Sequence, residues 1–446
     1  AIKQLIGLEL VVLDPDAMLR DACDEVAGEV AAPPPPPPSS CDYGVEAWGD
    51  FEPAFRTFVR SMEDEAKLTL IGRLFVLNRA KMFLKQRLRL VEFWKTSPRL
   101  PPVASPLFVV GLPRTGTTFL HTLLAQDTDT FMSPLNWMVV DPSPPATFGN
   151  IDEDIGAATG ERRAKMDAAN YNLDQFKQIA KNIDAQHVMS AFNPEECIVF
   201  MGHTWVTFEF MAYMGQAKAY SNWLRDLPSY ADAFKWHRQI LSHLASAATA
   251  EGGDDERVAP QRGRRWVLKT PFHMGMLDDL VREYPDADIV MTHRRPVRSM
   301  TSLSSLQSKL SSVCTDDLAP KKLAGHYLSL WDKFAAKAVA TREAWAKAGP
   351  AHPQHKTLDV NLRELHEAPM GVVMRIYERF GLTLSNAARA RMGSWLQGDG
   401  SRGKHGKNVY KAEWFGLEDR DAVLRAHPGL QQYDDYFCAR FEGECV

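Results

Sequence analysis

An eight-residue loop between a strand and a helix constrains the fold of this 446-residue chain most strongly. The apolar run 107–110 predicts a buried strand, and a helix is expected to begin at Thr117. Between them, residues 111–118 read Gly-Leu-Pro-Arg-Thr-Gly-Thr-Thr. Glycines permit the tight turn, and backbone N–H groups at the start of the helix converge on one point. The loop therefore predicts a phosphate or sulfate site, with a turn that binds no ligand as the alternative.

This loop differs from that of a nucleoside triphosphatase at one position. It has the Gly-x-x-x-x-Gly frame, but Thr117 stands where those enzymes have lysine. The cation of the loop is Arg114, two residues before the second glycine. Without the lysine, a magnesium-bound triphosphate loses its usual clamp. We expect the loop to bind a phosphate or sulfate group rather than Mg-ATP.

A second cluster of polar residues follows another expected strand, at 288–292. Basic residues come directly after this strand, and a serine-rich helix comes next. Ligands of open α/β sheets bind at the carboxyl ends of the strands. Arg294, at the tip of the strand, and Ser302, eight residues later, can reach one phosphate. Arg295 and Arg298 can equally be solvated charges.

Expected strands and helices alternate over most of the chain. This order predicts an α/β fold: a three-layer, P-loop-like domain with a central parallel sheet. Helical segments at 51–97 and 160–250 are expected to flank or cap it. The strands are expected at 107–110, 265–268, 288–292 and 356–360, and the helices from 117, at 274–283, from 297, at 325–347 and at 370–380 with Gly381 as its cap.

Two regions are expected along the chain. Residues 1–42 are expected to be an N-terminal arm, because residues 33–38 are an unbroken proline run that forms a stiff polyproline segment. A spacer and a ligand for an SH3-type domain are both open roles for it. Residues 43–446 are expected to form a single domain with a helical insertion at about 155–250.

Composition and charge exclude several classes of protein. The net charge is −4, which argues against a dedicated nucleic-acid binder. No apolar run approaches the ~20 residues that cross a bilayer. The six cysteines are scattered, with no Cys-x-x-Cys pair, which favours a reduced, cytoplasmic protein. We expect no metal site, because His352 and His355 lie in a proline-containing loop typical of solvated side chains.

Several segments resemble the 3′-phosphoadenosine 5′-phosphosulfate (PAPS)-dependent sulfotransferase superfamily. The loop resembles that of its bacterial-type and algal branch, G-x-P-R-[ST]-G-T-T. The resemblance covers most of residues 50–440. The other matching segments are 194–197 (P-x-E-C in that branch), 265–273 (W-V-L-K-[ST]-P-x-H), 369–381 (P-M…I-Y-x-x-F-G) and 403–410 (G-K-H…Y).

The resemblance implies the P-loop-like fold and PAPS as sulfonyl donor. The donor's 5′-phosphosulfate would be held by Arg114, Thr115, Gly116, Thr117 and Thr118.

The same resemblance assigns the donor's 3′-phosphate to a second set of residues. Arg294 and Ser302 would hold this phosphate, and the family's spacing of eight is kept. Arg402, Gly403 and Lys404 would close over it.

The chemistry implied is in-line sulfonyl transfer to a hydroxyl or amine of a small molecule, without a metal. Arg114, Lys269 and the loop N–H groups are suited to stabilise the charge that builds on the leaving nucleotide. His273, four residues after Lys269, is a candidate base. In animal cytosolic members the base is a histidine at the position of Pro271.

The general base has other candidates in this chain. Related members often carry a glutamate where this chain has Met138, so a base there is absent. The fallback candidates are Asp141, His203 and Glu195. Glu195 and Glu196 can instead be charges at the start of a helix.

The acceptor site and two other functions stay open. Aromatic residues in the helical cap can line an apolar acceptor pocket or be plain core: Trp137, Trp205, Trp223, Trp236, Phe208, Phe210 and Tyr213. The alternatives to a sulfotransferase are a P-loop kinase or nucleotidase and a catalytically silent nucleotide-binding protein.

Overall fold

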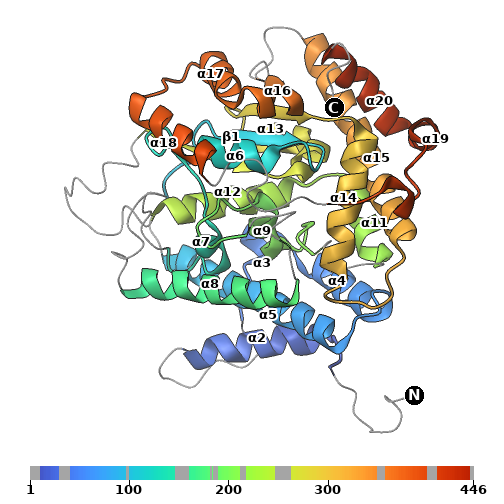
Figure 1. Cartoon of the computed structure of the whole chain (residues 1–446). Coiled ribbons are helices and arrows are strands. Elements are labelled where there is room, and N and C mark those ends of the chain that lie inside the picture. The colour runs from blue at the N-terminus through green and yellow to red at the C-terminus, as the bar shows by residue number, and fades with distance from the viewer. Residues whose placement is uncertain are drawn as a thin grey trace.

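Five parallel strands form the centre of the molecule, in the order β2-β3-β1-β4-β5 (Figure 1). The structure is a computed structural model that describes residues 11–29, 41–96, 100–145, 160–180, 183, 189–210, 217–246, 263–348, 357–398 and 409–441. The predicted parallel sheet is confirmed. Its strands are β1 (Leu107–Gly111), β2 (Phe131–Met132), β3 (Arg265–Lys269), β4 (Asp288–His293) and β5 (Thr357–Asn361).

Helices cover both faces of the sheet, so the predicted three layers are confirmed. Successive residues of a strand face opposite sides. In β1, Leu107 and Val109 pack into the core beneath α6 (Thr117–Ala125), whereas Phe108 and Val110 pack into the larger core on the other face. The first face also carries α16 (Leu362–Glu367), α17 (Pro369–Phe380) and α18 (Asn386–Gln397); the second carries α12 (Ala231–Ser246), α13 (Leu277–Glu283) and α15 (Pro320–Ala348).

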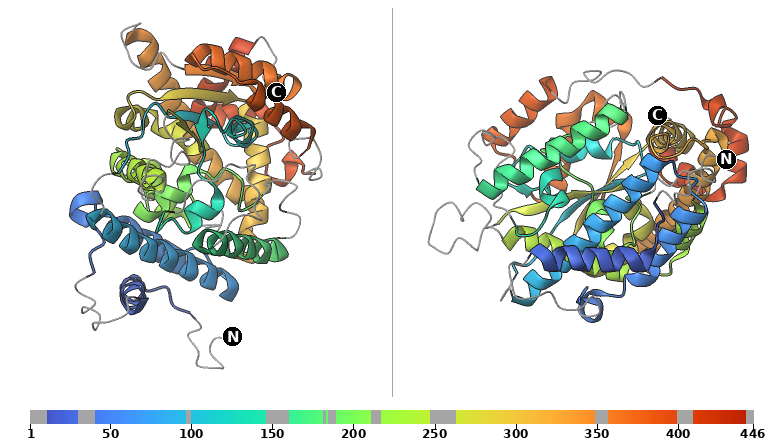
Figure 2. Two further views of the ribbon diagram at one scale, coloured as in Figure 1. Left: turned by 90° about the vertical axis from the view of Figure 1, so that its left-hand side faces the viewer. Right: turned by 90° about the horizontal axis from the view of Figure 1, so that it is seen from below.

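A layer of helices lies beyond α12, at the far end of the molecule from α17 (Figures 1 and 2). The rings of Phe75 and Phe176 meet edge to face, at 6.4 Å, between α5 and α8. The region expected to be helical at 51–97 is two helices, broken at residues 65–69. The layer contains α4 (Glu52–Asp64), α5 (Leu70–Thr96), α8 (Gly160–Ile179), α9 (Cys197–Met201) and α11 (Lys218–Asp226).

The remaining elements are short or lie along the edge of the sheet. The helix expected at 274–283 starts as a 3-10 turn and becomes regular only at Leu277. Gly381 ends α17 in the left-handed conformation (φ 68°), as expected for a helix cap. The remaining helices and 3-10 turns are α3 (Val45–Trp48), α7 (Asn136–Val140), α14 (Pro296–Ser311), α19 (Arg420–Ala426), α20 (Pro428–Tyr436), η4 (Gly202–Thr204), η6 (Pro271–Met276), η8 (Ala412–Trp414) and η9 (Cys438–Phe441).

Part of the predicted N-terminal arm belongs to the folded core. Residues 15–29 form α2 (Pro15–Glu29), and Met18 and Ala22 of this helix are buried in the larger core. The polyproline run lies outside the described residues.

The cysteines correct one expectation. Cys23 and Cys41 form a disulfide with a Cα–Cα distance of 6.0 Å, and Cys438 is also disulfide-bonded. Cys197 and Cys314 are free and buried. The prediction of a fully reduced protein is therefore wrong, and the cysteine argument for a cytoplasmic location no longer holds.

Among the helices of the described residues, none is both long enough and apolar enough to cross a membrane.

His121 of α6 gives the fold a specific sensitivity to acid. Its Nε2 lies 3.1 Å from the Val267 carbonyl oxygen and 3.0 Å from Ser133 Oγ. Burial, with a further contribution from the positive charge of Lys269, lowers the pKa of His121 to about 3. Because the unfolded chain binds this proton near pH 6.5, the folded state loses stability as the pH falls from 6.5 toward 3.

A His121→Gln variant, which cannot take up this proton, should lack that part of the pH dependence. We expect the free energy of unfolding of the native protein, relative to that of the variant, to fall by about 2 kcal/mol between pH 7.5 and pH 5.0. Urea unfolding of both proteins at the two pH values measures the difference. A constant difference between the proteins would contradict the expectation.

Candidate active site

The loop between β1 and α6 turns through conformations that favour glycine. Gly111 has φ 150° and Gly116 has φ 90°, and Arg114 between them is also left-handed at φ 65°. A Cβ at Gly111 would lie 2.3 Å from the Thr292 carbonyl oxygen. Glycine is therefore required where the loop passes β4, and α6 begins directly after Gly116.

Hydrogen bonds fix the loop against β4 and α14. Thr115 Oγ1 donates to the Leu112 carbonyl oxygen at 2.6 Å and lies 2.6 Å from Thr292 Oγ1. Ser299 Oγ donates to the Pro113 carbonyl oxygen. The side chain of Thr115 is fully buried, so it braces the loop from inside. Only its backbone N–H is available for a ligand.

Arg114, Arg294 and Ser302 lie together, as the sequence predicts. Arg114 Nε donates to Ser302 Oγ at 3.3 Å, and Arg294 Nη1 donates to the Arg114 carbonyl oxygen at 3.2 Å. Burial lowers the pKa of Arg114, and the positive charge of Arg294 lowers it further. Burial also lowers the pKa of Arg294, while its hydrogen bond with Tyr410 opposes that change. Buried guanidinium groups that lie this close together favour an anion beside them.

A cavity of about 710 Å³ opens beside these residues. Within the described part of the chain, Arg294, Arg298 and Arg363 have no carboxylate partner, and the buried Nε of Arg294 has no hydrogen-bond partner. Free cationic groups of this kind suit a phosphate. The cavity is lined by Arg294, Arg295, Val297, Arg298, Thr301, Arg363, Tyr410, Ala412, Leu417, Glu418 and Arg420.

Lys269 contacts both the start of α6 and the carboxylate of Glu196. Its Nζ donates to Thr118 Oγ1 at 3.1 Å and forms an ion pair with Glu196. Thr270 Oγ1 donates to the other carboxylate oxygen of Glu196 at 3.1 Å. The side chain of Lys269 is 1% exposed and that of Glu196 is 18% exposed, so the carboxylate is the accessible partner of this pair.

The two neighbouring glutamates differ in their surroundings. Glu195 Oε2 accepts a hydrogen bond from Asn136 Nδ2 at 2.6 Å, and burial raises the pKa of Glu195. Glu196 precedes α9, but its side chain makes no capping bond to the helix. Glu196 is therefore a charge at the start of α9, as that alternative expects, and its carboxylate also bonds Lys269 and Thr270. The sequence indicates Glu196 only as a charge at the start of a helix, because no spacing pattern in a linear sequence pairs it with Lys269.

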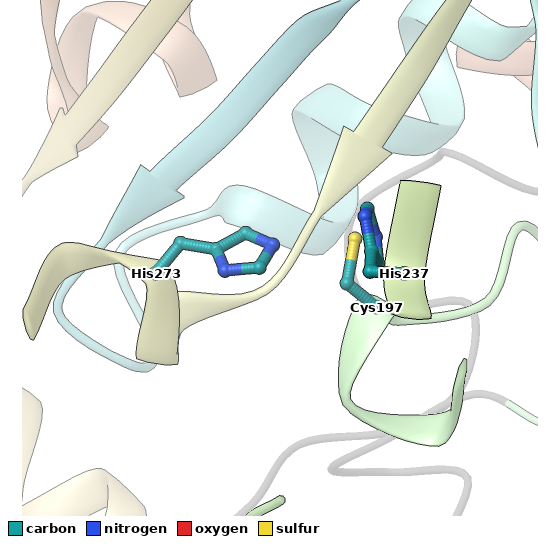
Figure 3. A group of neighbouring side chains, drawn as sticks. All are labelled: Cys197, His237 and His273. Atoms are coloured by element: carbon teal, nitrogen blue, oxygen red, sulfur yellow. The ribbon is translucent and has the colours of Figure 1, made fainter. Parts of the chain in front are cut away.

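His273 does not join this group. Its side chain is fully buried and packs against the rings of Phe108 and Phe234, at 5.4 and 5.1 Å between centroids. Its ring lies near Cys197 and His237 (Figure 3). A ring enclosed in this way has no access to an acceptor, so this placement does not support His273 as the base.

Two of the three fallback bases, His203 and Asp141, have their partners elsewhere. His203 is buried, and its Nδ1 and Nε2 bond Phe200 O and Gln86 Oε1. Asp141 pairs with Lys165 at 3.6 Å. Of the predicted site residues, Arg402, Gly403 and Lys404 lie outside the described residues, as do His352 and His355.

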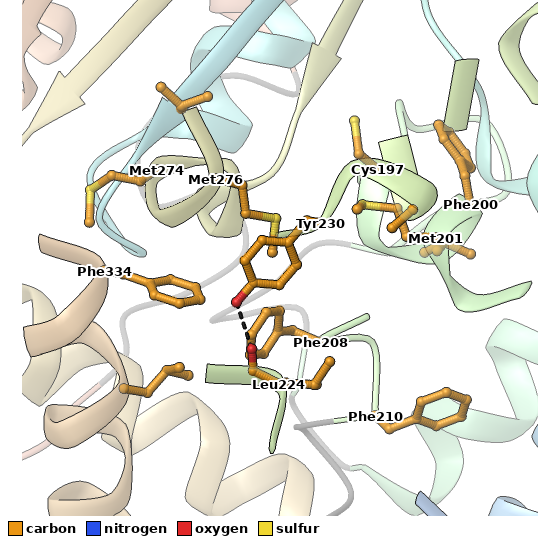
Figure 4. Packing of buried hydrophobic residues seen from close by; sticks show 14 of the residues in the cluster. Cys197, Phe200, Met201, Phe208, Phe210, Leu224, Tyr230, Met274, Met276 and Phe334 are labelled. Carbon is orange, nitrogen blue, oxygen red and sulfur yellow. Dashed lines mark hydrogen bonds between the residues drawn. The ribbon is translucent and has the colours of Figure 1, made fainter. Parts of the chain in front are cut away.

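The aromatic residues of the cap are mostly core. Trp205 stacks on Phe210 at 5.2 Å, and Phe208 stacks on Phe272 at 4.2 Å. Figure 4 shows Phe208 and Phe210 among other buried side chains, with Tyr230 Oη donating to the Leu224 carbonyl oxygen at 2.6 Å. Trp137, Trp205 and Trp236 are each no more than 2% exposed, Trp223 is partly buried, and Tyr213 lies outside the described residues.

The chain is similar to known sulfotransferases in sequence pattern and in fold. The model of the Sulfotransferase family matches residues 106–386, which include the loop, β3, β4 and α14. Sulfotransferase STF1 from Mycobacterium tuberculosis H37Rv is similar in structure, with a TM-score of 0.72 and 24% identity over 94% of this chain and 99% of that one. Sulfotransferase STF9 from Mycobacterium avium gives a TM-score of 0.73 and 22% identity, over 95% of this chain and 96% of that one.

These two structures establish the P-loop-like α/β fold. A search of curated proteins found no match. The matched segment of the family model spans more than half of the chain and contains Arg114, Glu196, Lys269, Arg294 and Ser302. The protein belongs to the sulfotransferase family.

Proposed function

We propose that this sulfotransferase takes its sulfonyl group from PAPS and transfers it to a hydroxyl or amine of a small molecule. The observation that carries the proposal is the group formed by Arg114, Arg294 and Ser302 at the carboxyl edge of the sheet. It stands next to Lys269 and Glu196 at the start of α6. Arg114, Arg294 and Ser302 thus offer positive charge and a hydroxyl for a nucleotide. Lys269 and Glu196 offer a cation and a carboxylate for the transfer step.

The residues present fit the two anionic ends of such a donor. Arg294, with an unpartnered buried Nε in the described structure, and Ser302 suit the 3′-phosphate. The backbone N–H groups of Thr117 and Thr118 at the start of α6, together with Arg114, suit the 5′-phosphosulfate. Exposed Arg298 and Arg363 add positive charge along the cavity.

The transfer needs a base and a group that stabilises the departing nucleotide. The acceptor oxygen or nitrogen forms a bond to sulfur while the bond from sulfur to the bridging oxygen breaks, and the electron pair stays on the nucleotide as 3′,5′-adenosine bisphosphate. Glu196 accepts the proton of the acceptor, because its partly buried carboxylate is more accessible than its partner Lys269. Lys269 and Arg114 stabilise the charge on the leaving oxygen.

The test is a transfer assay with PAPS and a panel of small alcohols, phenols and amines. The expected products are a sulfated acceptor and an equal amount of 3′,5′-adenosine bisphosphate, detected by mass spectrometry. Phosphoryl transfer from Mg-ATP to the same panel, with no reaction of PAPS, would contradict the proposal and indicate a kinase. PAPS binding without turnover of any acceptor would indicate a silent nucleotide-binding protein.

Arg294→Ala is expected to weaken binding of 3′,5′-adenosine bisphosphate by about 10–150-fold, the loss that follows from removing a charged hydrogen-bond partner. Isothermal titration measures the dissociation constant. Arg163→Ala is the matched control, because Arg163 pairs with Asp167 on the surface of α8. Equal affinity of Arg294→Ala and the native protein would contradict the assignment of the 3′-phosphate.

A further inference from the structure

Three potential metal ligands meet in the interior, behind the proposed transfer site. Cys197 begins α9, His237 lies in α12 and His273 lies in η6 (Figure 3). All three residues are fully buried. One ligand atom from each residue lies within 4.8 Å of the other two. Side chains that converge from three separate segments resemble a metal centre more than chance packing.

The histidine nitrogens in this cluster are not otherwise used. Within the described structure, neither ring nitrogen of His273 has a hydrogen-bond partner, and the same holds for Nε2 of His237. Leaving a buried polar group unsatisfied costs about 1–3 kcal/mol. A cation that coordinates one nitrogen from each ring would remove part of this cost.

His237 is held in the orientation that a metal ligand needs. Its Nδ1 lies 2.7 Å from Tyr284 Oη, and Tyr284 is itself fully buried. A partner on one ring nitrogen fixes the ring and leaves the other nitrogen, the unpartnered Nε2, available to a metal. Metal-binding histidines are commonly supported in this way.

We propose that Cys197, His237 and His273 bind one thiophilic closed-shell metal ion, Cu⁺ or Zn²⁺. Binding replaces the proton of the Cys197 thiol, which is released to solvent, by the metal ion, and nothing is oxidised or reduced. The ion would join α9, α12 and η6. Because Cys197 follows Glu196 directly and η6 follows Lys269 and Thr270, it would also fix the backbone that carries the proposed catalytic pair.

The distances are close to those of a bound state. Metal–nitrogen bonds of about 2.0 Å and metal–sulfur bonds of about 2.3 Å place ligand atoms roughly 3.5–3.8 Å apart in a trigonal site. The separations of up to 4.8 Å therefore need to close by about 1 Å, which small side-chain rotations achieve.

Charge and ligand number favour Cu⁺ over Zn²⁺. A thiolate and Cu⁺ are together neutral, whereas a thiolate and Zn²⁺ leave a net positive charge among the rings of Phe108, Phe200 and Phe234, where burial of charge is costly. Among the described His, Cys, Asp and Glu side chains no fourth joins the group, so Zn²⁺ would need a further ligand such as water or hydroxide to complete its usual four. Soft thiolate ligands bind both ions.

The test begins with the metal content of the purified full-length protein, measured by mass spectrometry after dialysis. About one equivalent of copper or zinc is expected in the native protein, and less than a tenth in Cys197→Ser and in His273→Phe. Cys314→Ser is the matched control, because Cys314 is the other described free buried cysteine, and it should keep the metal. The measured amounts of copper and of zinc in the native protein decide between the two ions.

A second measurement does not depend on the folding of the variants. The reduced native protein, stripped with chelator, is titrated with Cu⁺ and Zn²⁺ against a chromophoric competitor, and with Co²⁺ to look for a thiolate charge-transfer band. Stoichiometric binding with that band supports the site. Two results would overturn it: no binding by the native protein, or metal retained in both cluster variants.

Discussion

Glu196→Gln is expected to lower kcat for sulfonyl transfer by about 10²–10⁴-fold, the usual contribution of a positioned general base. The amide keeps the shape of the side chain and can still accept from Thr270, but it cannot take the acceptor's proton. The nucleotide side of the site, at Arg294 and Ser302, is untouched. The dissociation constant of 3′,5′-adenosine bisphosphate should therefore stay within a few-fold of the native value, and steady-state kinetics with titration measures both quantities.

Glu195→Gln is the matched control for this variant. Glu195 is the adjacent glutamate, and its carboxylate is occupied by Asn136 and by the backbone N–H of Glu196. Burial raises the pKa of Glu195, whose carboxylate lies away from Lys269 in its hydrogen bonds, so the Lys269–Glu196 pair stays intact in this variant. Native-like kcat in Glu196→Gln, or an equal loss in both variants, would refute the assignment of the base.

Lys269→Met should lower kcat by about 10²–10³-fold, because it removes a preorganised cation where charge develops on the leaving nucleotide. Methionine retains most of the apolar stem, which suits a side chain that is 1% exposed. The substitution also leaves Glu196 without its ion-pair partner. Single-turnover kinetics separates the loss in the transfer step from changes in binding.

The double variant with both substitutions tests whether Lys269 and Glu196 act as one unit. Residues that act together are not additive in their effects on kcat. We expect the double variant to be about as slow as the slower single variant. A loss equal to the product of the two single losses would mean that the two side chains act independently.

Much of the proposed nucleotide side of the site could be predicted from the sequence, because its residues are local to two strand ends. The run 107–110 and the glycines after it define a strand, a turn and a helix without any distant contact. Arg294 and Ser302 are separated by eight residues at the end of β4, and parallel strands deliver their carboxyl ends to one edge of the sheet. The structure brings both residues to Arg114 for this reason.

The catalytic side could not be predicted in the same way, because it depends on contacts between distant segments. Glu196 meets Lys269 across 73 residues, and no spacing rule connects them. The sequence suggests His273 as the base because it follows Lys269 closely. The 3-10 turn of η6 instead directs its side chain into the core. Strand β2 could not be predicted either, because two residues are too few to show a periodic pattern. The disulfide between Cys23 and Cys41 likewise depends on how α2 folds onto the domain.

The proposed function depends on a site for a 3′-phosphorylated nucleotide formed by the loop and Arg294. The most direct measurement is a thermal-shift titration with 3′,5′-adenosine bisphosphate, ADP and ATP, each with and without Mg²⁺. A ligand at 100 times its dissociation constant stabilises the native state by about 2.7 kcal/mol, which is a readily measured rise in Tm. We predict a rise with 3′,5′-adenosine bisphosphate that does not depend on Mg²⁺. A rise only with ATP and Mg²⁺ would contradict the account.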